Sequence, residues 1–514
     1  MAVGLLSGCG SSDEKQQSAK KTESDTLTMA INYMPASFQP SAASDDQVIV
    51  DRPIFDQLFV DTKDGMDYYL AEKLDISEDG KTYTIHLNPD ANWSDGTPVT
   101  VADVLFTINY SGLKTQGVSS YNSLNGQPIQ FNEIDEKTLE IVLPETYNIY
   151  TATLGRMTVL PAHAFDNDPE KVDASGYFNS KDMAVSGAYT ISEINDDSIV
   201  YESRDDYYRG TPKVKKIVMK TIGSGSTKQV AFENGEISYM RVTTKEELEK
   251  YEKESDQYNI YSIPESRLNY LQVNPYGPMK DKLSEDGRKA LFLALNPKEI
   301  VDAAYGTDKL AVPANSLLTP EQVLYDPDCK GYEQNLEEAK KLAKSSGLEG
   351  ETLVYIYNAD RPNMEAVATV IQQQLAEIGV KLSIEGLDSP TFFNRFFGVS
   401  FATGEETTWD LGTNGWDSEQ GSNLGQAYRY FNATPRAWGF SDEVAQLAID
   451  VNNEADLEKA KEEAKGLQEA ALAEYYEYPL TYTNYIMVSQ KNVKGLDAKP
   501  VVPEFVDYLP IEVE

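Results

Sequence analysis

Residues 351–386 carry the pattern that most narrows the fold of this chain. Apolar residues alternate over 353–357, as in a short strand, and then recur at helical spacing over 367–378. Gly379 ends the helical pattern, and a second alternating stretch runs over 380–384. A strand, a helix and a strand in this succession form a βαβ unit with parallel strands and a right-handed crossover. The sequence therefore predicts a fold of the α/β class.

Length and charge narrow the class of protein. A chain of 514 residues is longer than one hydrophobic core usually supports, so we expect two or three lobes. No apolar run approaches the length of a membrane-spanning helix. The formal net charge of −38 argues against binding of nucleic acid and against electrostatic docking on anionic lipid, because both need a basic face. Such acidity keeps an extracellular protein soluble, with selection of cationic ligands as the alternative.

Catalytic chemistry finds little support in the residues. The only two histidines, His86 and His163, leave little for acid–base work or for a metal site. No HExxH, CxxC or GxSxG motif occurs, and the Gly-rich stretch 223–226 lacks the lysine pattern of a phosphate-binding loop. We therefore expect a protein that is not an enzyme and that holds no metal and no cofactor.

The stretch 79–109 predicts a strand, a proline-stiffened turn and a helix capped by Thr100, with Asp103 three residues on. The sequence of this stretch closely resembles the signature of the family-5 solute-binding proteins of bacterial ABC importers. It reads DGKTYTIHLNPDANWSDGTPVTVADVLFTIN. This family includes the oligopeptide- and dipeptide-binding proteins. Further stretches that resemble family motifs are spread from about residue 27 to about residue 500, among them 186–189, 204–210, 232–237, 288–300 and 415–416.

The resemblance implies a periplasmic-binding-protein-like fold, in which two α/β lobes close over a ligand and an extra lobe is inserted early in the first. Two crossings between lobes, near 265–270 and near 480, are then expected to act as the hinge. Mapped onto this sequence, lobe I is 26–58, 180–265 and 482–514, lobe II is 59–179, and lobe III is 266–481.

The N-terminal residues predict where the protein is located in the cell. Residues 6–9, Leu-Ser-Gly-Cys, match the lipobox of bacterial lipoproteins, so we expect residues 1–9 to be a signal-peptide remnant and Cys9 to carry lipid. The polar segment 10–25 is typical of a flexible tether. Cys329 is the only other cysteine, so no disulfide is expected. These features predict anchoring to the outer face of the cytoplasmic membrane, or a periplasmic location.

The resemblance also implies a ligand and partners. We expect a monomer that captures short peptides and delivers them to an ABC permease driven by a cytoplasmic ATPase. In peptide-binding members an acid shortly after a Gly-Trp pair, here Gly415 and Trp416, holds the peptide's α-ammonium. Glu419 has the matching spacing, Asp417 is a nearby competitor, and a solvated loop in which neither binds is the third alternative. The backbone that encloses the peptide corresponds to the segment around Asp417 and to Ser44, Asp45 and Asp46.

The peptide's carboxylate needs a cation. Arg361 precedes Pro362 at the head of the predicted helix, near where dipeptide binders place an arginine, and Arg395 falls near a second basic position of oligopeptide binders. For each, an ordinary surface arginine is the alternative. Tyr121 and Tyr270 complete the ligand-binding candidates as aromatic side chains.

The alternative ligands within this family are a nickel complex, an oligosaccharide or an opine-like compound. A hydrolase or a surface adhesin are the alternatives from other classes.

Overall fold

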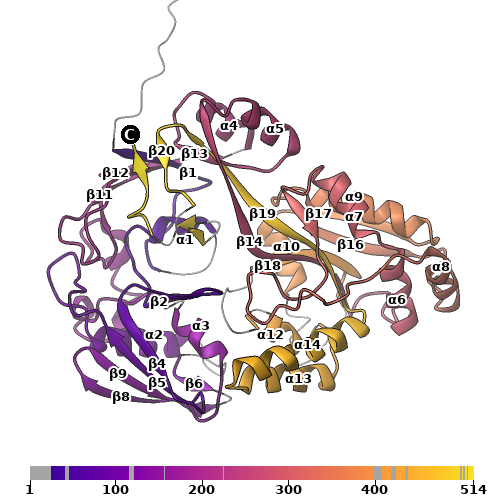
Figure 1. The fold of residues 1–514 in the computed structure, drawn as a ribbon, viewed down its shortest axis with the longest axis horizontal. Helices are drawn as coiled ribbons and strands as arrows, with labels where there is room; N and C mark the ends of the chain where they lie inside the picture. Colours follow the sequence, from indigo (N-terminus) through magenta and orange to yellow (C-terminus); the bar gives the residue numbers. More distant parts are fainter. Residues whose placement is uncertain are drawn as a thin grey trace, which may run out of the picture.

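The structure is a computed structural model with an α/β architecture of several sheets (Figure 1). The residues that it describes are 25–40, 45–114, 121–124, 126–155, 157–223, 225–398, 407–417, 424–425, 427–433, 438–497, 500–501, 504–505 and 507–514.

Two long antiparallel strands, β14 (Tyr258–Val273) and β19 (Glu477–Gln490), run through the middle of the molecule. Figure 1 shows them as a pair that passes from the side of β13 into the right-hand body. Their register shifts between Pro264 and Leu268 and again between Asn269 and Tyr270, and such irregularities bend strands. The predicted crossings near 265–270 and near 480 fall within this pair, although the hinge itself stays a prediction.

The two long strands belong to a seven-stranded sheet of order β13-β19-β14-β18-β16-β17, in which β15 also pairs with β19. Strands β16 (Thr352–Asn358) and β17 (Lys381–Leu387) are parallel neighbours, and α9 (Met364–Ala376) connects them. The βαβ prediction is therefore confirmed in both its elements and its strand direction. The other elements around this sheet are β13 (Tyr239–Val242), β15 (Ala311–Pro313), β18 (Leu411–Asp417), α6 (Glu285–Ala294), α7 (Pro297–Ala304), α8 (Leu336–Ser345) and α10 (Ser389–Phe396).

Two smaller four-stranded sheets form the left-hand body of Figure 1. One has the order β1-β12-β11-β10 and combines the start of the described chain with a later stretch, since β1 (Thr26–Ile31) is parallel to β12 (Lys216–Thr221). The other has the order β4-β5-β9-β8. Their remaining members are β10 (Tyr189–Ile194), β11 (Ser198–Ser203), β4 (Ala71–Ile76), β5 (Thr82–Leu87), β8 (Gln130–Asp135) and β9 (Thr138–Val142).

The family-like stretch 79–109 folds into the predicted strand, turn and helix, but the cap is only half of the one predicted, because the backbone N–H of Asp103 donates to the backbone oxygen of Thr100 at 3.0 Å and not to its hydroxyl. Strand β5 is followed by a turn and by α2 (Val101–Lys114), and the backbone N–H of Thr100 donates to Asp103 Oδ2 at 2.9 Å. The other oxygen of Asp103 accepts from the backbone N–H of Ala162 at 2.9 Å. Asp103 is buried, so this carboxylate joins the helix start to a distant loop and has a structural role.

The sequence over about 442–474 predicts one long helical region, and the structure has two helices there, α13 (Asp442–Asn453) and α14 (Leu457–Ala473). The break lies at 454–456, where Asp456 caps α14 by accepting from the backbone N–H of Lys459 at 3.0 Å. An N-cap aspartate starts a new helix because it satisfies an N–H group that has no partner within the helix. Apolar periodicity continues across the break, which is why the sequence pattern resembles one helix.

The remaining short elements are α1 (Asp45–Asp51), β2 (Phe59–Thr62), β3 (Gly65–Tyr68), β6 (Ser123–Leu124), β7 (Gln127–Pro128), α3 (Ile149–Gly155), α4 (Gly225–Glu233), α5 (Lys245–Lys253), α12 (Ala427–Phe431), β20 (Val493–Lys494), β21 (Pro500–Val501), β22 (Glu504–Phe505) and β23 (Glu512–Val513).

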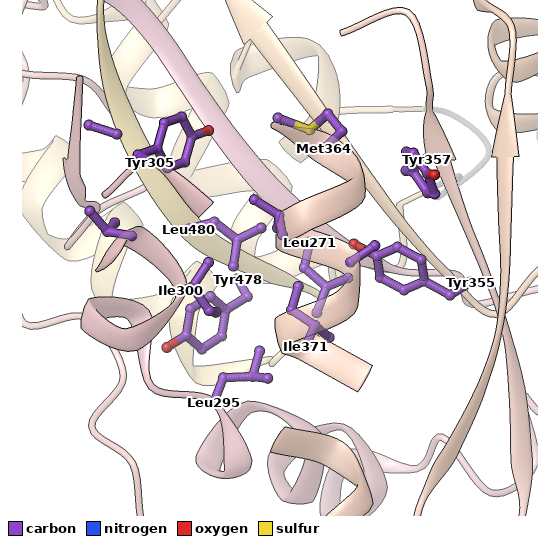
Figure 2. Packing of buried hydrophobic residues seen from close by; sticks show 14 of the residues in the cluster. Leu271, Leu295, Ile300, Tyr305, Tyr355, Tyr357, Met364, Ile371, Tyr478 and Leu480 are labelled. Atoms are coloured by element: carbon purple, nitrogen blue, oxygen red, sulfur yellow. The ribbon is translucent and has the colours of Figure 1, made fainter. Parts of the chain in front are cut away.

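Four clusters of buried apolar residues hold these layers together. The cluster in Figure 2 packs Ile371 of α9 and Tyr355 of β16 beside Leu271, Tyr478 and Leu480 of the long strands. Residues 231–258 share this cluster, while several residues of 160–178 join the cluster around β1. The lobe boundaries drawn from the sequence stay a prediction. None of the described helices combines the length and the apolar composition that crossing a membrane requires.

Candidate ligand-binding site

A cavity of about 60 Å³ lies where the long strands meet the start of α9. Its wall is strongly polar, because arginines from three separate segments face it: Arg241 from β13, Arg267 from β14, and Arg361 from the loop before α9. The other lining residues are Val242, Thr243, Glu265, Asn269, Tyr305, Leu310, Pro362, Asn363, Met364, Thr483 and Asn484.

Glu265 is the carboxylate of this cavity, and it is held by several groups. One guanidinium nitrogen of Arg241 lies 3.2 Å from Glu265 Oε2 and 3.4 Å from Oε1, and the hydroxyl of Thr483 donates to Oε2 at 2.5 Å. Burial by itself raises the pKa of Glu265, yet the charges of Arg241 and Arg267 and the Thr483 hydrogen bond hold it below its ordinary value. Glu265 is therefore a charged, buried group at neutral pH.

The guanidinium of Arg361 forms no ion pair with any of the residues that the structure describes. Among the residues that the structure describes, the Nε–H group of Arg361 is buried and has no hydrogen-bond partner. The neighbouring Asn363 has a left-handed backbone (φ 64°) and donates from Nδ2 to the backbone oxygen of Thr243 at 3.3 Å. Asparagine adopts this conformation more readily than most residues with a side chain, and here it joins the start of α9 to the end of β13. Arg361 is thus a cation with an unused donor in a polar cavity.

Strand β18 brings the Gly-Trp pair beside the cavity. In the antiparallel register of β14 and β18, Arg267 pairs with Asp417 and Asn269 pairs with Gly415. A Cβ atom on Gly415 would lie 2.5 Å from Asn269 Oδ1 and 2.9 Å from Arg267 Nε. Glycine is therefore required at 415, because the side chains of Asn269 and Arg267 pass closely over its backbone.

Trp416 and Tyr270 lie in a buried aromatic cluster and do not line the cavity. Their exposed fractions are 3% and 0%, and their ring centroids are 4.8 Å apart. The hydroxyls of Tyr270 and Tyr430 are hydrogen-bonded at 2.9 Å. In this structure Trp416 of β18 and Tyr270 of β14 pack against other buried apolar residues. A contact of either side chain with the ligand stays a prediction.

The structure places Arg395 and Tyr121 away from the cavity. Arg395 forms an ion pair with Glu385 at 2.5 Å and donates to Thr408 Oγ1 at 3.2 Å. Tyr121 is half-buried, and its backbone oxygen accepts from the hydroxyl of Tyr150 at 2.8 Å. Neither side chain lies among the cavity residues. Five further predictions fall on positions that the structure does not describe: Cys9, Ser44, Glu419 and the side chains of Asp45 and Asp46; for Asp417 only the backbone is described.

Arg241, Glu265 and Arg267 were not predicted from the sequence. Part of the signal was present, because Glu265, Arg267 and Asn269 are polar residues at every second position before the apolar end of β14. This alternation places three polar side chains on one face of a strand. Arg241 has no comparable local signal, since β13 approaches β14 only through the intervening β19.

Comparison with known proteins shows which family this chain belongs to. Residues 66–438 match the family model described as bacterial extracellular solute-binding proteins, family 5 Middle. The dipeptide-binding protein DppE of Bacillus subtilis (strain 168) is 24% identical over 550 residues, covering 98% of this chain and 96% of DppE.

Two solved structures extend the likeness to the fold. The ABC transporter substrate-binding protein CtaP of Listeria monocytogenes is 27% identical, with a TM-score of 0.83 over 95% of this chain and 99% of CtaP. AppA from Clostridium difficile is 30% identical, with a TM-score of 0.82 over 95% of this chain and 100% of AppA. The chain therefore belongs to the bacterial extracellular solute-binding proteins of family 5, and it is a binding protein and not an enzyme.

Proposed function

We propose that this protein binds short peptides outside the cell and delivers them to an ABC import permease. The observation that carries the proposal is the buried Nε–H of Arg361, a residue that lines a polar cavity at the start of α9, since this donor has no partner among the residues that the structure describes. A buried donor without a partner costs free energy, and a carboxylate from a ligand would remove that cost with a charge-assisted hydrogen bond. The terminal carboxylate of a peptide supplies this group.

The other end of the peptide would lie near the end of β18. Asp417, the last residue of β18, pairs in register with Arg267, a residue of the cavity, and Glu419 comes two positions later in the sequence. Neighbouring strands are about 4.8 Å apart. A group that binds the ammonium and a group that binds the carboxylate would then lie around one small cavity, which favours peptides of a few residues.

Other ligands occur among proteins of the same fold. Solved structures of this fold include DppA of Helicobacter pylori in complex with the peptide STSA, NikZ of Campylobacter jejuni with Ni(L-His), and AgaA with agropinic acid. These proteins are 18–21% identical to this chain, so they share its fold without indicating its ligand. The content of two histidines in 514 residues favours a peptide over a nickel complex.

The proposal also covers where the protein is anchored and how it delivers peptides to the permease. Cys9 would carry the lipid that holds the protein, as a monomer, at the outer face of the membrane, and residues 10–25 would let the binding lobes reach the permease. Closure of the lobes over a peptide follows if the ligand contacts both of them, since it then binds the closed state more tightly.

The proposal is tested by exposing the purified protein to a mixture of di- to pentapeptides and analysing the bound fraction by mass spectrometry. Intact peptides with free termini are the expected result. Recovery of a nickel complex, a sugar or an opine in their place, or no enrichment of any peptide, would contradict the proposal.

A further inference from the structure

Two guanidinium groups from different parts of the chain line the same cavity, and both have an unused donor. Arg241 comes from β13, at the edge of the seven-stranded sheet, and Arg361 comes from the loop before α9. The Nε–H groups of both are buried and have no hydrogen-bond partner among the described residues. Two buried donors on residues that line one cavity favour an acceptor that comes from outside the chain.

The guanidinium of Arg241 is held in a defined orientation. Its Cζ lies 4.4 Å from the ring centroid of Tyr485, so the aromatic ring supports one face of the group. One terminal nitrogen lies 3.2 Å from a carboxylate oxygen of Glu265, while the Nε–H has no partner within the described part of the chain. A planar guanidinium can serve two acceptors on different edges, and here one of those edges is occupied.

The residues that line the cavity carry an excess of positive charge. Arg241, Arg267 and Arg361 are set against the single carboxylate of Glu265 among them. The charges of Arg241 and Arg267 hold the pKa of that carboxyl below its ordinary value. One carboxylate from a ligand would offset part of the remaining charge, and a neutral amide would leave it uncompensated.

We infer that Arg241 is a second residue that recognises the anionic end of the ligand. In this arrangement the terminal carboxylate of the peptide accepts one hydrogen bond from Arg241 Nε–H and one from Arg361 Nε–H. The inference rests on the proposed function, because it takes the ligand to be a peptide with a free carboxylate. Since β13 lies in predicted lobe I and Arg361 in predicted lobe III, one carboxylate would join the two lobes and would favour their closure.

The alternative is that Arg241 serves only as the counter-ion of Glu265, and a set of variants separates the two roles. In Arg241→Gln/Glu265→Gln both members of the ion pair lose their charge, so no buried charge is left unpaired. In Arg241→Lys the charge beside Glu265 is kept, but the planar fork with its Nε–H is lost. Arg395→Gln is the matched control, because Arg395 pairs with Glu385 outside the cavity. Thermal unfolding checks that each variant is folded.

The probes are alanine peptides of two to five residues, each as the free acid and as the C-terminal amide, measured by titration calorimetry. We expect Arg241→Gln/Glu265→Gln and Arg241→Lys to lose roughly ten- to hundredfold in affinity for the acids and little for the amides. Small-angle scattering should show compaction of the wild type with acids and not with amides.

Equal losses for acids and amides would overturn the inference and leave the proposed function intact, as would full binding by Arg241→Lys. If no member of the series binds to the wild type, the proposed function fails, and this inference fails with it.

Discussion

Arg267 of β14 and Asp417 of β18 stand opposite each other in the antiparallel ladder at the edge of the polar cavity. This pairing connects two features that are 150 positions apart in the chain: the cavity and the end of the strand that carries the Gly-Trp pair. It places the backbone of Asp417, one of the two candidate acids, beside the strand that carries Glu265 and Arg267 of the cavity.

Gly415→Ala should weaken both binding and folding, because its new methyl group would lie 2.5 Å from Asn269 Oδ1 and 2.9 Å from Arg267 Nε. Moving these groups should cost about 1–3 kcal/mol in the free energy of unfolding, measured by urea denaturation. Gly466→Ala is the control, since a Cβ at this helical position meets nothing within 4 Å, and it should leave binding unchanged. Unchanged stability and affinity in Gly415→Ala would show that Arg267 and Asn269 do not depend on this contact.

Glu477 makes stability depend on pH. It is 0% exposed, and both of its carboxylate oxygens lack a partner among the described residues. Burial raises the pKa of Glu477 well above its ordinary value of 4.5, so the native state keeps a proton that the unfolded chain loses. The stability of the wild type should therefore fall as the pH rises above about 4.5.

Glu477→Gln removes this ionisation and should raise the free energy of unfolding by roughly 1–3 kcal/mol at pH 8, with a gain that shrinks towards pH 4. Urea denaturation at a series of pH values measures the effect. The control is Glu458→Gln, because that side chain is 82% exposed and its neutralisation should change little. A gain that is constant with pH would show that Glu477 does not titrate in this way.

Glu419→Gln tests which acid holds the peptide's ammonium. The change keeps the volume and removes the charge, so free peptides should lose about 2–5 kcal/mol of binding free energy, the range for breaking a buried charge pair. N-acetylated peptides have no ammonium and should lose little further. Asp417→Asn is measured beside it by calorimetry. If free and acetylated peptides lose equally in Glu419→Gln but unequally in Asp417→Asn, then Asp417 is the ammonium partner.

Cys9→Ser tests the lipid anchor. Expressed behind a complete signal peptide, this variant should leave the membrane fraction, whereas the wild type should stay there and incorporate a labelled fatty acid. Cys329→Ser should behave like the wild type, because Cys329 is a buried free cysteine with a pKa that burial raises to about 11. A wild type that stays in the membrane without lipid label would show that another feature holds it there.

The parts of the fold that the sequence predicts well are local. The βαβ unit over 351–386 was predictable because its strands, its helix and the terminating Gly379 each leave a periodic or conformational signal in neighbouring residues. The hydrogen bond from the backbone N–H of Thr100 to Asp103 was predictable for the same reason. Helices α13 and α14 were merged, because a break of three residues does not interrupt the apolar spacing.

The parts that the sequence predicts poorly depend on pairing between distant segments. Arg241 meets Glu265 because β13 and β14 both pair with β19, and no local pattern specifies that register. Tyr270 and Trp416 are aromatic residues near the expected ligand, but which face of a strand a side chain takes is decided by the sheet around it. Here both lie on the packed face. Only Arg361 among the predicted basic residues lies in the cavity.

The most direct test of the account compares the affinities of the wild type, Arg361→Gln and Arg395→Gln for a short peptide and for its C-terminal amide, by titration calorimetry. If Arg361 holds the carboxylate, Arg361→Gln should lose about 2–5 kcal/mol for the acid and little for the amide. Arg395→Gln should bind both like the wild type, since its guanidinium is paired with Glu385. Equal losses for acid and amide in Arg361→Gln, or a selective loss in Arg395→Gln, would contradict the assignment of this cavity as the carboxylate site.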